Sequence, residues 1–177
     1  MAENPSDLYE KDFVRWAEAQ ATALREAARA GTNLPLDWEN LAEEIESLAR
    51  SDRRELRSRL NQIIEHLLKL NYSRASDPRP GWMDSVRQQR SEIELLLEQS
   101  PSLKRQVAQM IEQQAARAAR DVAGSFADHG ETVSEILPPA YTEEQVLGDW
   151  FPEPAVRSPR KPGGPRRGRR PPSRGAS

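Results

Sequence analysis

The sequence of 177 residues contains no cysteine, which excludes a disulfide framework, a cysteine-based zinc site and a thiol nucleophile. Its uninterrupted apolar runs are at most three residues long, whereas a membrane-spanning helix needs roughly 20 apolar residues. We therefore expect no contact with the membrane interior. The first 12 residues lack the apolar core of a secretion signal, so we expect a cytoplasmic protein.

Aromatic residues are also few, at 6%, and the formal net charge is only −2. That small value conceals two parts of opposite charge. Residues 157–177 contain eight Arg or Lys and no Asp or Glu, whereas the rest of the chain contains 18 basic and 28 acidic residues, a net charge of −10. We interpret residues 1–155 as a single domain and residues 156–177 as a separate tail.

Apolar residues recur at spacings of three and four along most of the chain, a pattern typical of amphipathic helices, and no stretch shows the two-residue period of a strand. Residues 38–72 contain neither Gly nor Pro, which indicates one very long second helix. We expect residues 73–81 to form a loop. The four main helices are predicted at residues 7–30, 38–72, 82–99 and 101–123.

The C-terminal part should differ from these four helices. A capping box at residues 142–145 predicts one or two helical turns, and we expect Trp150 and Phe151 to pack back on the bundle. The tail contains no apolar residue larger than Ala after Val156, so it is predicted to be disordered. The expected fold is therefore all-α, a bundle of four main helices with a short C-terminal helical wrap and a disordered basic tail.

Many short segments follow one another in an order that is typical of one family. They are LYEKDF (8–13), Trp16, LAEEIESL (41–48), RREL (53–56), SRL (58–60), HLLK (66–69), Trp82, QR (89–90), SPSL (100–103) and PAYT (139–142). Together they resemble a bacterial family, the domain of unknown function 29. The resemblance covers roughly residues 7–154 and implies an all-helical, cytoplasmic protein without an assigned activity or known catalytic residues. The basic tail lies outside the family pattern.

A polar ridge borders the apolar stripe of the long helix, because its members recur at three- and four-residue steps. The ridge consists of Asp52, Glu55, Arg59, Gln62 and His66. The next helix carries Arg90 within its own apolar stripe, where a guanidinium needs a partner, since an unpaired buried charge costs several kcal/mol. The simplest partner is the carboxylate of Asp52 or Glu55.

Two interpretations of these residues remain open. In the first, the ridge is a lattice of polar bonds that sets the register between two helices, with a half-buried His66. In the second, the chain is an enzyme acting on a phosphate-containing substrate, with His66 as general base, Arg90 holding an anionic group and Glu55 orienting one of them. We prefer the first interpretation.

Metal and cofactor chemistry finds little support. Neither His66 nor His129 follows a Glu at the three-residue spacing of di-iron bundles, and a carboxylate site at Glu43, Glu44 and Glu46 is less expected than a solvated helix face. Phosphate-binding glycine loops and hydrolase serine motifs are missing from the sequence. We therefore predict neither a metal nor a cofactor, and we expect His129 to be a solvated loop residue.

The tail is the strongest electrostatic feature. Its cations can neutralise nucleic-acid phosphates, but without aromatic side chains it should bind any sequence alike. Alternatively it covers its own acidic domain. We favour a non-enzymatic interaction module that forms a homo-oligomer or binds a protein partner, with an anion-binding tail. The candidate anion-binding residues are Arg160, Lys161, Arg166, Arg167, Arg169 and Arg170.

Overall fold

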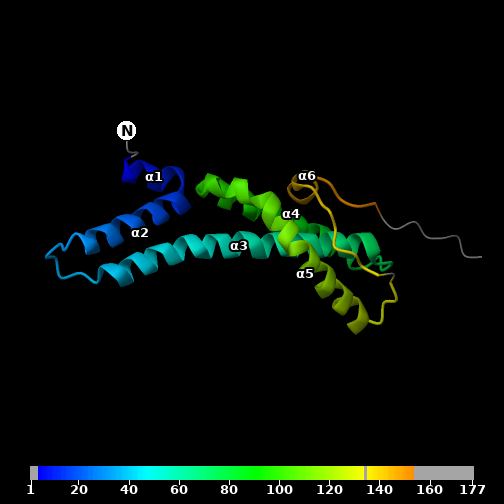
Figure 1. Ribbon diagram of the computed structural model, residues 1–177. Coiled ribbons are helices and arrows are strands. Elements are labelled where there is room, and N and C mark those ends of the chain that lie inside the picture. Colours follow the sequence, from blue (N-terminus) through cyan, green and yellow to red (C-terminus); the bar gives the residue numbers. More distant parts are fainter. Residues whose placement is uncertain (1–3, 134, 154–177) are drawn as a thin grey trace, which may run out of the picture.

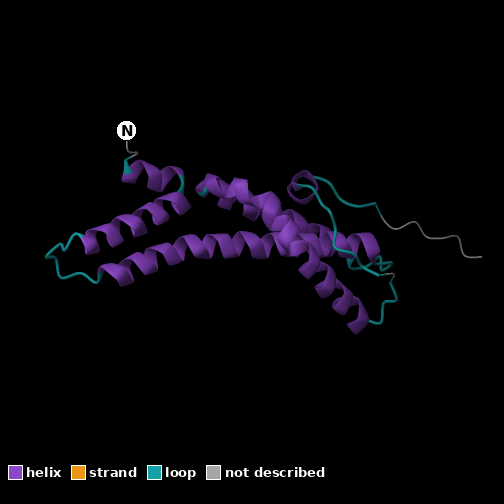
Figure 2. Cartoon of the chain, in the orientation of Figure 1, coloured by secondary structure: helices purple, strands orange, loops and turns teal. Residues whose placement is uncertain are grey.

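The computed structural model describes residues 4–133 and 135–153 (Figure 1). All regular elements within these ranges are helices, which confirms the all-α prediction (Figure 2). None of them is long and apolar enough to cross a bilayer. The elements are α1 (Pro5–Lys11), α2 (Phe13–Arg29), α3 (Trp38–Tyr72), α4 (Arg79–Gln99), the 3₁₀ helix η1 (Pro101–Gln106), α5 (Val107–Asp128) and α6 (Glu143–Leu147).

The 35-residue helix α3 is the element on which the others assemble, and at 1.5 Å per residue it is about 50 Å long. Helix α2 runs along its N-terminal half, while α4 and α5 pack on its C-terminal half (Figure 1). The long second helix is thus as predicted. The largest fully buried side chains of α3 gather in the half that α4 and α5 cover. They are Leu56, Leu60, Ile63, Ile64, Leu67, Leu68 and Leu70.

The other half of α3 forms a hairpin arm with α2. Small residues such as Ala21 and Ala49 are buried between the two helices and allow a close approach. Ion pairs flank this contact, with Arg25 Nη2 lying 2.6 Å from a carboxylate oxygen of Glu46. At the tip of the arm, the loop residue Leu34 is 60% exposed.

The predicted single helix over residues 7–30 is wrong, because the chain breaks at Asp12 into α1 and α2. Asp12 has extended backbone angles, φ −160° and ψ 92°, and its carboxylate caps α2 by accepting from the N–H of Arg15 at 3.1 Å. The same carboxylate accepts from the backbone N–H and the hydroxyl of Ser102, at 2.8 and 2.9 Å. These tertiary bonds explain why the helix is interrupted where the apolar spacing continues.

Two further helix boundaries differ from the prediction. Helix α4 begins at Arg79 rather than residue 82, because Pro80 lies in the first turn, where a missing N–H breaks no helical hydrogen bond. After Pro101 the chain first forms η1, and α5 then continues through Gly124 to Asp128.

The C-terminal wrap follows the prediction more closely. Thr142 and Gln145 form the expected capping box at the start of α6. Phe151 packs against the core as expected, whereas Trp150 contacts Tyr141 but stays 36% exposed. The predicted disorder of the tail and its boundary at residue 156 lie outside the described residues.

Candidate functional site

The polar ridge of α3 forms a seam of hydrogen bonds against α4 and the residue that follows it. Arg59 Nη1 donates to Gln89 Oε1 at 2.9 Å, and Gln62 Nε2 donates to Ser85 Oγ at 3.4 Å. Ion pairs extend the seam, because Arg59 Nη2 lies 3.4 Å from Glu92 Oε2 of α4 and 2.7 Å from Glu55 Oε1 of α3. These contacts have the geometry of the register-setting lattice, the first of the two interpretations.

Asp52 closes this seam at the far end of α4. Its carboxylate accepts from the hydroxyl of Ser100 at 3.5 Å, and Ser100 is itself fully buried between α4 and η1. Burial, and next the charge of Glu55, raise the pKa of Asp52. The role of Asp52 is therefore to join α3 to the start of η1.

His66 lies apart from these bonds. Its ring is half-buried, and its Nδ1 atom is buried with no hydrogen-bond partner among the described residues. Burial, and next the positive charge of Lys69, lower the pKa of His66. The imidazole is therefore neutral near pH 7, a state that suits a proton acceptor but equally suits a packed side chain.

Arg90 does not pair with Asp52 or Glu55, so that expectation is wrong. Its guanidinium donates to the backbone carbonyls of Gln145 at 3.0 Å, Val146 at 2.9 Å and Trp150 at 2.8 Å. Two of these carbonyls belong to the last turn of α6, where helical C=O groups have no partner within the helix. The cation thus caps α6 and holds the C-terminal wrap.

The surroundings of Arg90 fit this structural role. Its guanidinium lies over the ring of Phe151, 4.8 Å from the centroid. Burial lowers the pKa of Arg90, and the charge of Asp149 partly opposes this effect. Because arginine stays protonated throughout the physiological pH range, the group stays cationic, but its donors are bound to carbonyl oxygens rather than open to a substrate anion.

The three candidate catalytic residues therefore do not converge. Glu55 and His66 are 11 residues apart on α3, about 16 Å along the helix. Glu55 is bound to Arg59, and Arg90 faces α6. Of the three residues, only Arg90 lines the groove described next.

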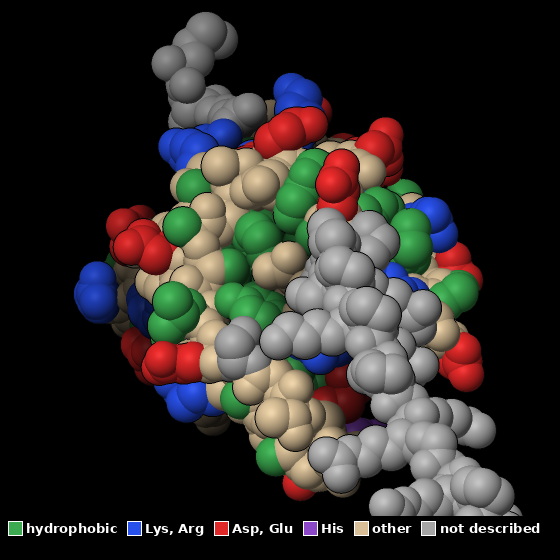
Figure 3. Space-filling model, turned by 90° about the vertical axis from the view of Figure 1, so that its right-hand side faces the viewer, with side chains coloured by type: hydrophobic (Ala, Val, Ile, Leu, Met, Phe, Trp, Pro, Cys, Tyr) green, Lys and Arg blue, Asp and Glu red, His purple; other side chains and the backbone are tan. Residues whose placement is uncertain are grey.

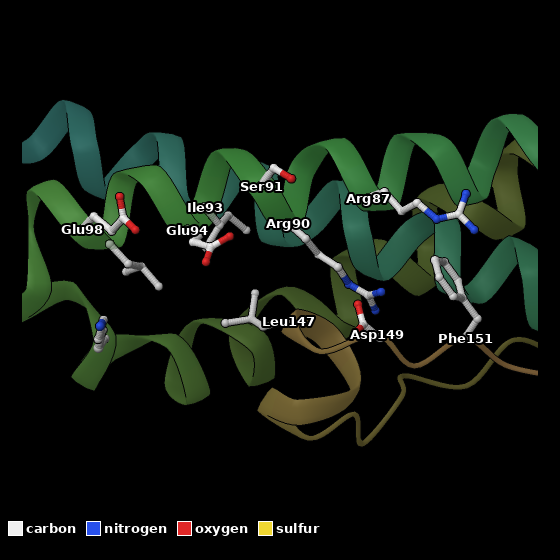
Figure 4. Close-up of a pocket in the computed structure, with 11 residues that line it drawn as sticks. Arg87, Arg90, Ser91, Ile93, Glu94, Glu98, Leu147, Asp149 and Phe151 are labelled. Atoms are coloured by element: carbon white, nitrogen blue, oxygen red, sulfur yellow. The ribbon is translucent and has the colours of Figure 1, made fainter.

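A groove of about 780 Å³ lies between α4, η1 and the C-terminal wrap (Figure 4). Its floor is apolar and its rim carries both charges, with Arg90 and Phe151 at one end and Glu98 at the other. Figure 3 shows the molecule from the right-hand side of Figure 1, with hydrophobic side chains in the middle of that face and charged groups around its margin. The mixed apolar and charged lining of the groove suits contact with an extended or helical segment.

Sequence reasoning missed this groove. The only signal for it was the pair Trp150 and Phe151, two bulky residues in an otherwise weakly patterned segment. Since one wall comes from α4 and the other from residues about 50 positions later, periodicity within either segment does not show that they meet.

The remaining candidates have simple surroundings. Glu43 and Glu46 bind Arg25 and Arg50, and nowhere in residues 4–133 and 135–153 do three His, Asp or Glu side chains gather as metal ligands. His129 is exposed directly after α5, with its Nδ1 atom 2.7 Å from the carbonyl oxygen of Ser125. The predicted anion-binding residues 160–170 lie outside the described residues.

Comparison with known proteins identifies the family. No curated protein matches the chain. The crystal structure of an alpha-helical protein of unknown function from Rhodospirillum rubrum ATCC 11170 is similar, with a TM-score of 0.66 and 24% sequence identity, over 86% of this chain and 94% of that one. This likeness shows the shared fold alone. The family described as domain of unknown function DUF29 matches residues 8–151, so the chain belongs to that family.

Proposed function

We propose that this chain is a non-enzymatic helical interaction module that binds polyanions through its C-terminal tail. The observation that carries this proposal is the placement of charge: eight cations and no acid lie within residues 157–177. In the helical domain, by contrast, the catalytic candidates of the enzyme alternative are engaged in helix packing or lie apart from one another.

The binding should be electrostatic and independent of the nucleotide sequence. Arg and Lys side chains displace counterions from phosphates, which makes affinity fall steeply as salt rises. Residues 157–177 contain no aromatic side chain for stacking on bases. Non-specific binding of this kind has dissociation constants of roughly 10⁻⁴ to 10⁻⁶ M at physiological salt. The acidic domain, at −10, weakens it further by repulsion.

The first prediction tests this binding with a charge-matched control. In one variant four tail residues, Arg166, Arg167, Arg169 and Arg170, are changed to Gln. In the control, four exposed domain residues without ion pairs among the described residues, Arg54, Arg57, Arg74 and Arg120, are changed to Gln. Anisotropy of labelled 20-nucleotide RNA and DNA is measured against salt concentration for both chains.

We expect the tail variant to show weaker binding and a flatter dependence of log affinity on log salt, because up to four phosphate contacts are lost. The control should keep the slope of the parent chain. Equal slopes in the two variants, or selective binding to one sequence, would contradict tail-mediated binding.

That the chain forms a homo-oligomer or binds a protein partner stays a prediction. Sedimentation velocity of the full chain measures its oligomeric state.

The enzyme alternative has less support. It needs His66, Glu55 and Arg90 in one pocket, whereas Glu55 is bound to Arg59 and Arg90 is bound to α6. Its remaining support is the neutral imidazole of His66, whose Nδ1 atom has no partner in the described part of the chain. Turnover of phosphate esters by the full chain that is lost in His66→Gln would revive it.

A further inference from the structure

Acidic and basic residues follow one another in two blocks at the C-terminal end of the chain. Residues 121–156 contain eight Asp or Glu and no Lys or Arg, and residues 157–177 contain eight Lys or Arg and no Asp or Glu. The first block includes α6 and the segment that forms one wall of the groove. The cations thus begin a few residues after the chain leaves that wall.

Two carboxylates without an ion pair lie toward one end of the groove. The lining as a whole has three acidic and three basic residues, but they are not evenly placed. Arg87 and Arg90 lie toward the other end, where the charge of Asp149 acts on Arg90 (Figure 4). Glu94 and Glu98 form no ion pair among the described residues, so their end of the groove favours a positively charged occupant.

The apolar floor adds a second requirement, which the tail also meets. Pro159, Pro162 and Pro165 follow one another at intervals of three residues. Three residues make one turn of a polyproline II helix, so this spacing favours three prolines on one side of a bound segment. Proline-rich segments dock in grooves lined by aromatic and apolar side chains, and Phe151 and Leu97 line this one.

The covalent connection allows this contact. Phe151 lies beside Arg87 at one end of the groove, with Glu94 and Glu98 toward the other end (Figure 4). From Arg87 to Glu98 the axis of α4 spans about 16 Å. Seven extended residues reach about 24 Å, so a chain that turns back after Glu153 brings Arg160 within range of both carboxylates.

We propose that residues 157–165 dock in the groove between α4 and α6 of their own chain. Arg160 and Lys161 contact Glu94 and Glu98, and the three prolines contact the apolar floor. The docked cations are then withdrawn from polyanions, which makes the domain an inhibitor of its own tail. Only this regulatory consequence rests on the proposed function; the docking itself does not depend on any external partner.

The test uses the absence of native cysteine, because Ser173→Cys introduces a single thiol for a nitroxide spin label. Paramagnetic relaxation of backbone amides is then recorded on the full chain at low salt. We expect strong broadening at Ser91, Glu94 and Glu98, little at the tip of the arm, and loss of the effect at high salt. Broadening spread evenly over the domain would overturn the proposal.

Two variants of equal charge supply the control. Glu94→Lys with Glu98→Lys alters the groove, and Glu39→Lys with Glu44→Lys alters exposed acids on the arm. Only the groove variant should lose the localised broadening. It should also bind RNA about threefold to tenfold more tightly than the arm variant, as expected for two lost surface ion pairs. Equal broadening in both variants would overturn the proposal.

Two further outcomes separate the alternatives. Failure of every chain to bind RNA, with localised broadening intact, rejects polyanion binding and supports docking. In a mixing experiment, one chain carries the isotope label but no spin label, and the other carries the spin label but no isotope label. Broadening of the first chain's amides would place the tail on a second copy and would overturn docking within one chain.

Discussion

At the scale of single residues, burial decides the protonation of His66. The ordinary pKa of histidine is about 6.5, and burial with the nearby charge of Lys69 lowers it in the folded chain. The unfolded chain therefore binds more protons below pH 6.5 than the folded chain does. The contribution of His66 to stability is complete above that pH and is lost as the pH falls through the lower, folded-state pKa.

We therefore predict that His66→Gln reduces the loss of stability between pH 7.5 and pH 5, measured by urea unfolding at each pH. Burial raises the pKa of Asp52 and Glu65, which acts in the opposite direction, and comparison with the parent chain cancels that contribution. His129→Gln removes the other histidine, at an exposed ring, and is the matched substitution control. An equal loss of stability between pH 7.5 and pH 5 in the parent chain and in His66→Gln would contradict the prediction.

Arg90 carries a second prediction at this scale. Arg90→Met removes three donors to backbone carbonyls and should cost about 2 kcal/mol, since hydrogen bonds from charged groups contribute roughly 1.5–3 kcal/mol. Arg87→Met, at an exposed site, should cost under about 0.5 kcal/mol. Urea unfolding measures both. In a double-mutant cycle with Glu55→Gln, a coupling above about 0.5 kcal/mol would contradict the separation of Arg90 from the ridge.

At the scale of elements, a tertiary contact overrides a continuous helical pattern at Asp12. The carboxylate serves two elements, because it caps α2 and also binds Ser102 in η1. Both segments belong to the stretches that carry the family resemblance, LYEKDF and SPSL, and the structure places them in direct contact. The break lets α1 fold against α2 instead of extending it.

We predict that Asp12→Ala costs about 2–4 kcal/mol, because a helix cap and two buried bonds are lost together. Asp37→Ala is the matched control, since Asp37 caps α3 through Asn40 at an exposed position and should cost about 1 kcal/mol. The free energy of unfolding of the two variants is compared by urea denaturation. Similar costs at both positions would show that the contact with η1 contributes nothing.

At the scale of the whole molecule, the core of the described residues extends from α1 to α6. Buried apolar side chains of the described residues run from Leu8 to Val146, and α3 contacts α2, α4, α5 and α6. The residues that pack against this core end with Phe151. Charge is distributed differently, since the cations of residues 157–177 follow the last of these residues.

We predict that a chain ending at Pro154 unfolds with a free energy within about 1 kcal/mol of the full chain, because almost no apolar surface is removed. Thermal and urea unfolding of the two chains measure this difference. Surface ion pairs contribute little to the free energy of unfolding. Docking of the tail is therefore compatible with a small, salt-dependent difference in that free energy between the two chains. A large fall in melting temperature at high salt would show that the tail packs into the core.

The sequence by itself determined the helical class, the long helix over residues 38–72, the capping box before α6 and the segregation of charge. These features depend on local properties, namely the 3.6-residue period, the absence of Gly and Pro, and hydrogen bonds between residues three apart. It also identified the ridge of α3 and Arg90 as polar groups bordering apolar stripes, which is a statement about one helix at a time.

Only the tertiary structure decided which partners these groups have. Arg90 binds carbonyls at the end of α6 rather than an acid of α3, and Asp12 breaks a helix to reach Ser102. The groove likewise forms from α4 and a wall about 50 residues later. Such partners are widely separated in the chain, and a donor meets them only once the core has oriented both helices. The spacing of residues within one helix therefore does not indicate which distant partner a side chain binds.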